Sequence, residues 1–151
     1  VGHRALPARL LENLPGKVVM RDSVPRQELA SIYANSGALV FPSLCEGFGM
    51  VITEAMAHGV PVITTRHTAG ADLIRDGVNG WLVPVRDVEA LTEVMHWCLH
   101  HRDKVVAAGE EAARSAARWQ WSDYRARLAS CVREAVGKGC EQGMEIVAGV
   151  R

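Results

Sequence analysis

Apolar residues in the first two thirds of the chain occur either in short continuous runs or with helical spacing. The continuous runs are bounded by turn residues and predict β-strands at 17–21, 38–41, 60–64 and 80–85. The other segments predict helices at 5–14, 25–35, 50–57 and, more briefly, 70–75. In the second of these helices, Leu29, Ile32 and Tyr33 share one side, which we expect to face a core.

This alternation of strands and helices predicts right-handed βαβ units and a parallel sheet. Strands that are apolar throughout fit a sheet that helices cover on both faces. The fold class that we expect is therefore α/β, with a Rossmann-like parallel sheet of about four strands flanked by helices and followed by an all-helical segment.

From Asp87 onward the pattern is entirely helical. We expect Asp87 to cap a helix that ends near His101. Its apolar side consists of Leu91, Val94, Met95, Cys98 and Leu99. Two further helices are predicted at 103–118 and, with Ser122 as the cap, at 122–135.

The length of 151 residues suits one domain with a substantial core, and we assign residues 1–136 to it. The remaining stretch, 137–151, is rich in glycine and has no clear period, so we interpret it as a mobile tail. His96 and His100 have the i, i+4 spacing of metal ligands, but the glutamate and third ligand of a metal motif are missing. We therefore expect no metal site.

The charge balance limits the partners that we expect. The chain has 17 Lys and Arg residues and 17 Asp and Glu residues, which gives no support for a nucleic-acid or anionic-membrane surface. No apolar run approaches the roughly 18 residues of a transmembrane helix. Four cysteines without C-x-x-C spacing are interpreted as free thiols. We expect a cytoplasmic protein, with the cytoplasmic face of the membrane as the alternative location.

The chain is organised around residues 42–61, which read P-S-L-C-E-G-F-G-M-V-I-T-E-A-M-A-H-G-V-P. The strand expected at 38–41 leads into a turn at 46–49, here called the glycine turn, and the helix at 50–57 follows it. Amides at the start of a helix lack partners and carry partial positive charge, so the glycine turn is a candidate anion site. Its two glycines allow a ligand to approach the backbone closely.

Glu54 is the informative residue of this helix, because its neighbours are almost all apolar and predict a buried helix. A buried carboxylate needs hydrogen-bond donors, since leaving it unpaired costs several kcal/mol. The donors could be structural, such as Arg66 or a backbone amide, or they could be hydroxyl groups of a ligand. Because Glu46 stands beside the same anion site, the second alternative suits a ligand with both phosphates and hydroxyls, such as a sugar nucleotide.

The stretch from Glu46 to Val62 closely resembles the E-x7-E signature of family 4 retaining glycosyltransferases, which have the two-Rossmann GT-B architecture. Two further segments resemble that family in the same order. Residues 38–43 resemble its strand that ends in Pro-Ser, and residues 76–84 resemble its later D-G-x-N-G-x-L-V segment. The resemblance covers about residues 1–124.

The resemblance implies the C-terminal, donor-binding domain of a retaining glycosyltransferase that uses a nucleoside-diphosphate sugar. In the implied site, Glu46 is catalytic: it contacts the hydroxyls of the donor sugar and stabilises the reacting centre. Glu54 binds the ribose hydroxyls. The backbone amides that hold the sugar and diphosphate belong to Gly47, Phe48, Gly49 and Met50. The resemblance implies no cofactor, because the nucleotide sugar is itself a substrate. It also implies a reaction without a metal.

The chain departs from the family in what it lacks, at one position and in one loop. The N-terminal GT-B domain and the Arg and Lys that neutralise the diphosphate in the family are absent. We therefore expect a fragment that transfers no sugar without its N-terminal half. Asp22 stands where the family usually has glycine, and residues 68–72 depart from its Gly-Gly-x-Pro-Glu.

The expected partners are a nucleotide sugar and the missing N-terminal domain. The resembling family has six strands in its donor domain, so four strands leave a gap. We expect the strand at 17–21 to pair directly with the strand at 38–41, and the remaining exposed edges to cause self-association. The alternative function is a non-catalytic nucleotide-sugar-binding or interaction module.

Overall fold

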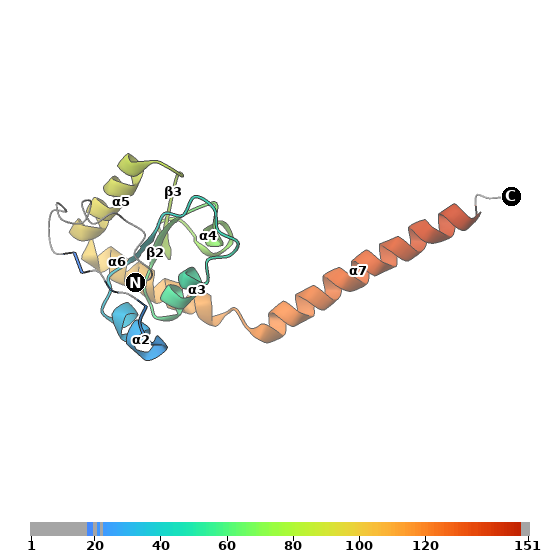
Figure 1. Ribbon diagram of the computed structural model, residues 1–151, viewed down its shortest axis with the longest axis horizontal. Helices are drawn as coiled ribbons and strands as arrows, with labels where there is room; N and C mark the ends of the chain where they lie inside the picture. The colour runs from blue at the N-terminus through green and yellow to red at the C-terminus, as the bar shows by residue number, and fades with distance from the viewer. Residues whose placement is uncertain (1–17, 20, 22, 149–151) are drawn as a thin grey trace.

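A computed structural model describes residues 18–19, 21 and 23–148 of the chain (Figure 1). Within them, three parallel strands form one sheet in the order β1 (Leu39–Phe41), β2 (Val62–Thr65) and β3 (Gly80–Val83). The last three of the four predicted strands and the α/β class are thereby confirmed. β2 is the middle strand and is buried along its whole length, as expected for a strand covered on both faces.

The predicted strand at 17–21 does not form in those of its residues that the structure describes. Val18 and Val19 belong to no strand and are 51% and 62% exposed. A strand is stable only when its backbone groups pair with a neighbour, and among the described strands β1 pairs with β2 alone. The sheet of described residues therefore has three strands rather than four. The helix predicted at 5–14 lies outside the described residues.

Helices cover both faces of the sheet (Figure 1). They begin and end within a few residues of the predicted positions: α2 (Arg26–Ala34), α3 (Met50–Ala57), α4 (Gly70–Leu73), α5 (Val88–His100) and α6 (Arg102–Ala117). Val62 faces a core built with α2 and α3, whereas its neighbour Ile63 faces a second core built with α5. Successive residues of a strand point to opposite faces, so one strand serves two cores.

α6 packs closely against the end of α3. Gly109 of α6 faces the carbonyl of Gly59, and a Cβ atom at position 109 would lie 2.2 Å from that oxygen. Ala112, one turn further along α6, is fully buried in the core shared with α3. Small residues on α6 thus allow the two backbones to approach.

α5 begins as predicted, because the Asp87 side chain accepts a hydrogen bond of 2.9 Å from the amide of Ala90. Its apolar side is only partly covered. Leu91, Val94 and Cys98 pack in the second core, but Met95 and Leu99 are 42% and 66% exposed. The uncovered residues line an apolar groove of about 610 Å³ beside β1, together with Gly37, Val40, Val105 and Val106.

The last helix, α7 (Trp121–Ala148), extends away from the α/β body (Figure 1). Ser122 is not its cap: the carbonyl of Gln120 accepts the first helical bonds, from the amides of Asp123 and Tyr124. The helix also continues beyond the predicted end at 135, because isolated glycines weaken a helix without ending it and no proline follows. The interpretation of 137–151 as mobile stays a prediction.

Candidate functional site

The glycine turn connects β1 to α3 at the carboxyl edge of the sheet. Gly49 caps α3 in the left-handed conformation, with φ of 78°. A Cβ atom at this position would lie 3.3 Å from both Glu46 Cγ and Phe41 Cε1. Glycine is therefore required for its backbone angle, and its small size lets the Glu46 side chain pack against the start of the helix.

The amides of the glycine turn are left open. In the part of the chain that the structure describes, no acceptor pairs with the amides from Gly47 to Met50. The first amide of α3 that is bonded belongs to Ile52, which donates to the Gly49 carbonyl at 2.9 Å. Open amides at the start of a helix form a region of partial positive charge.

The surroundings of the glycine turn are exposed and apolar. Glu46 and Gly47 are exposed, and the side chains of Leu44, Phe48 and Met50 are 51%, 49% and 69% exposed. Large apolar side chains that gather at the surface commonly mark a contact with a ligand or another domain.

The prediction that α3 is buried on nearly all sides is wrong. Ile52, Ala55 and Met56 are buried, but Met50 and Ala57 are exposed and Glu54 is only partly buried. The reason lies in the packing: α3 packs against the sheet and α6, with Tyr33 of α2 beside it, and the residues that face away from these contacts stay open to solvent.

Glu54 lies beside the hydroxyl of Tyr33, which comes from α2. Burial raises the pKa of Tyr33, and the charge of Glu54 and a hydrogen bond to it raise that pKa further. Neither of the structural partners predicted for Glu54 is seen: no ion pair joins it to Arg66 in the described part of the chain. Tyr33 was expected only as a core residue, although a buried tyrosine usually finds a partner for its hydroxyl.

The support of the glycine turn was likewise not predicted from the sequence. The loop after β2, residues 66–69, is here called the β2–α4 loop. Its His67 carbonyl accepts from the amide of Glu46 at 3.0 Å, and its Ala69 amide donates to the carbonyl of Phe48 at 2.9 Å. These bonds link residues about twenty positions apart, so only the placement of neighbouring strands brings them together.

The described residues contain no group of three or more histidine, cysteine or acidic side chains that could hold a metal ion. His100 Nδ1 lies 2.8 Å from the carbonyl of His96, within its own helix. The expectation that no metal takes part stays a prediction. Among the described helices, none is both long and apolar enough to cross a membrane.

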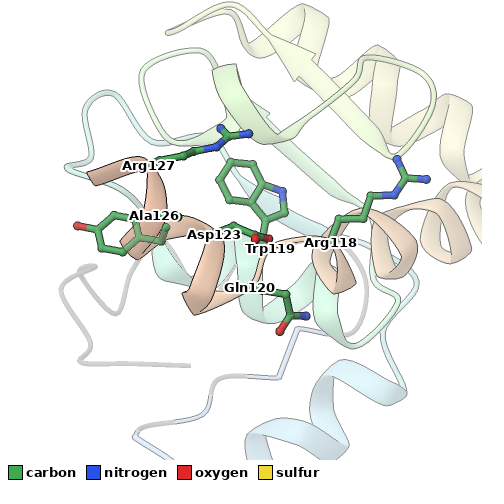
Figure 2. Close-up of a pocket in the computed structure, with 7 residues that line it drawn as sticks. Arg118, Trp119, Gln120, Asp123, Ala126 and Arg127 are labelled. Carbon is green, nitrogen blue, oxygen red and sulfur yellow. The ribbon is translucent and has the colours of Figure 1, made fainter. Parts of the chain in front are cut away.

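A separate hollow of about 490 Å³ lies where α6 meets α7 (Figure 2). It is lined by Arg118, Trp119, Gln120, Asp123, Tyr124, Ala126 and Arg127. Figure 2 shows the indole ring of Trp119 standing in this hollow, with Arg118 and Arg127 on either side. None of the residues predicted for the site belongs to it.

Comparison with known proteins places the chain in a family. The family described as "Glycosyl transferases group 1" matches residues 1–101. A D-inositol 3-phosphate glycosyltransferase of Corynebacterium urealyticum is 34% identical over 109 residues, which are 72% of this chain and 26% of that protein. The chain belongs to the group 1 glycosyltransferase family, and it spans about a quarter of the length of this relative.

Solved structures agree with this assignment. Sucrose-phosphate synthase from Thermosynechococcus elongatus superposes with a TM-score of 0.72 at 26% identity, over 87% of this chain and 33% of that one. Anabaena HepE in complex with UDP superposes with a TM-score of 0.63 at 23% identity, over 72% of this chain and 30% of that one. A second structure of HepE contains UDP-glucose. The likeness to HepE concerns the fold.

Proposed function

We propose that this chain is the donor-binding part of a retaining glycosyltransferase, which transfers a sugar from a nucleoside-diphosphate sugar to an acceptor. The observation that carries the proposal is the set of open amides from Gly47 to Met50, which lies between Glu46 and Glu54. Open amides at a helix start bind phosphate oxygens, and flanking carboxylates accept hydrogen bonds from hydroxyls. Membership of the group 1 family supports this, as do the UDP and UDP-glucose bound by HepE.

Each residue has a role in the proposed site. The open amides hold the sugar and the diphosphate. Glu54 accepts hydrogen bonds from the ribose hydroxyls through the oxygen lone pairs that Tyr33 leaves available. Glu46 contacts the hydroxyls of the donor sugar and stabilises the positive charge that develops at the reacting carbon. No metal and no cofactor takes part in this proposal.

Transfer is proposed to need an N-terminal domain in addition to these 151 residues. The exposed side chains of Leu44, Phe48 and Met50 around the glycine turn are the surface that we assign to this partner. The chain alone is expected to transfer no sugar. We further propose a cytoplasmic location, which three free cysteines at positions 45, 98 and 131 support.

An NMR titration tests the proposed binding. The 151-residue chain is titrated with uridine, guanosine and adenosine diphosphates while the backbone amides are followed. At least one of the three is expected to shift the resonances from Gly47 to Met50. The proposal fails if none of them perturbs these amides. Turnover after addition of the N-terminal half then separates a catalytic part from a module that only binds.

A further inference from the structure

Two threonines end β2 beside the point at which β1 leaves the sheet. The hydroxyl of Thr64 donates to the carbonyl of Phe41 at 2.8 Å, and the hydroxyl of Thr65 donates to the carbonyl of Ser43 at 2.6 Å. The two threonines are 0% and 1% exposed. The backbone pairing of the two strands ends at Phe41 and Thr64, so these side chains extend the contact between them toward the glycine turn.

Thr68 completes the network from the β2–α4 loop. Its hydroxyl donates to the carbonyl of Thr65 at 2.9 Å, accepts from the amide of Gly70 at 2.9 Å, and lies 3.2 Å from the hydroxyl of Thr64. Gly70 leaves room for this arrangement, because a Cβ atom there would lie 2.4 Å from Thr64 Cγ2. No buried polar side-chain atom in the described part of the chain lacks a partner, and a fully satisfied polar network is rigid.

The network and the backbone bonds of the β2–α4 loop hold the glycine turn at three points. Thr65 holds the chain at Ser43, just before the turn. The bonds at Glu46 and Phe48 hold the turn itself. Hydrogen bonds weaken steeply when donor and acceptor are misaligned, so the direction in which these contacts aim the open amides determines how well they bind an anion.

We propose that Thr65 is a positioning residue for the donor diphosphate: by holding the Ser43 carbonyl, it sets the path of the chain into the glycine turn and the direction of the open amides. Thr65 is buried and does not touch the ligand. This inference rests on the proposed function, in which those amides bind the diphosphate.

Two substitutions separate the hydroxyl of Thr65 from its shape. Thr65→Val keeps the shape and removes the donor, whereas Thr65→Ser keeps the donor. The probe is whichever of uridine, guanosine and adenosine diphosphate binds the unsubstituted chain most tightly, together with the matching nucleoside. Thr65→Val is expected to weaken the diphosphate about tenfold and to leave the nucleoside unchanged, whereas Thr65→Ser stays within about twofold for both.

The ratio of diphosphate affinity to nucleoside affinity is the decisive quantity, because a lower fraction of folded protein reduces both affinities equally. Thr92→Val is the matched control: it removes a hydroxyl bond of 2.7 Å to the carbonyl of Val88 on the exposed side of α5 and should not change the ratio. If Thr65→Val does not fold, Thr65→Cys replaces it, since its weaker donor should give an intermediate ratio.

Two results would overturn the inference and leave the proposed function intact. One is an unchanged ratio of diphosphate to nucleoside affinity in Thr65→Val, and the other is a fall of this ratio in Thr65→Ser as large as that in Thr65→Val. Failure of the unsubstituted chain to bind any of the diphosphates would overturn the proposed function, and this inference with it.

Discussion

The ring of Tyr33 stacks on the imidazole of His58, with 5.4 Å between the ring centroids and 16° between their planes. Tyr33 lies near the end of α2, and His58 ends α3 four residues after Glu54. Tyr33 therefore contacts both Glu54 and His58 and joins α2 to the end of α3 beside the proposed ribose-binding carboxylate.

Substitution Tyr33→Phe keeps the ring and its contact with His58 but removes the hydroxyl. The Glu54 carboxylate then loses its donor, so we expect nucleoside diphosphate binding to weaken by about 1 kcal/mol, which calorimetry would measure. In a chain that already carries Glu54→Gln, Tyr33→Phe should not weaken nucleoside diphosphate binding any further. Tyr124→Phe on α7 is the matched control, and an equal loss of affinity there would contradict this role of Tyr33.

The two carboxylates of the site are expected to differ in their effects. Glu54→Gln should weaken nucleoside diphosphate binding by about 1–3 kcal/mol, the scale of a lost hydrogen bond to a charged group. Glu46→Gln should leave this affinity unchanged and abolish turnover once the N-terminal half is added. Calorimetry and steady-state kinetics give the two readouts, and the reverse pattern would mean that the roles are exchanged.

Substitution Gly109→Ala should destabilise the fold. The added Cβ atom would meet the Gly59 carbonyl oxygen at 2.2 Å, so α6 must shift away from α3, at a cost of about 1–3 kcal/mol in the free energy of unfolding. Urea denaturation would measure this loss of unfolding free energy. Gly37→Ala is the control, because no atom lies within 4 Å of a Cβ there. Equal stability of the two variants would show that the helices can separate without cost.

Glu111 makes stability depend on pH. Hydrogen bonds from Arg114, at 2.8 Å, and from Arg75 lower its pKa from the ordinary value of 4.5. A lowered pKa in the folded state adds stability above the unfolded-state pKa and loses it as the pH falls through the folded-state value. Glu111→Gln should therefore be less stable than the unsubstituted chain near neutral pH.

The difference in unfolding free energy between Glu111→Gln and the unsubstituted chain should shrink as the pH is lowered below about 4.5. Urea titrations from about pH 7 to about pH 3 would measure it. Glu93→Gln, on the exposed side of α5, is the control. A difference that stays constant over this range would show that the ion pairs contribute nothing through protonation.

The isolated chain is expected to self-associate through the open edge of β1. Among the described strands this edge has no partner, and the apolar groove beside it includes Val40, which is 37% exposed. Unpaired edges with apolar surroundings recruit a second chain. Light scattering after size-exclusion chromatography should give more than the monomer mass, and Val40→Lys should restore the monomer. Val78→Lys, in an exposed turn, is the control; a monomeric unsubstituted chain at high concentration would contradict the prediction.

Local patterns in the sequence determined most elements of this protein. The helix at 50–57 could be predicted to the residue, because its apolar run stands between Gly49, which adopts a left-handed angle, and a stop at Gly59. Asp87 could be identified as a cap because its hydrogen-bond partner, the amide of Ala90, is only three residues away. The prediction that the glycine turn binds an anion likewise rests on a helix start, which is a local property.

Only the tertiary structure decided which distant residues meet around the proposed site. Glu54 contacts Tyr33 because α2 packs beside α3, and Thr65 reaches Ser43 because β2 lies next to β1. The segment 17–21 has the composition of a strand, but Val18 and Val19 remain exposed because a strand also requires a neighbour, which composition does not supply. Hydrogen bonds between segments depend on register and helix packing, and these arise from the burial of the whole core rather than from any one stretch of the chain.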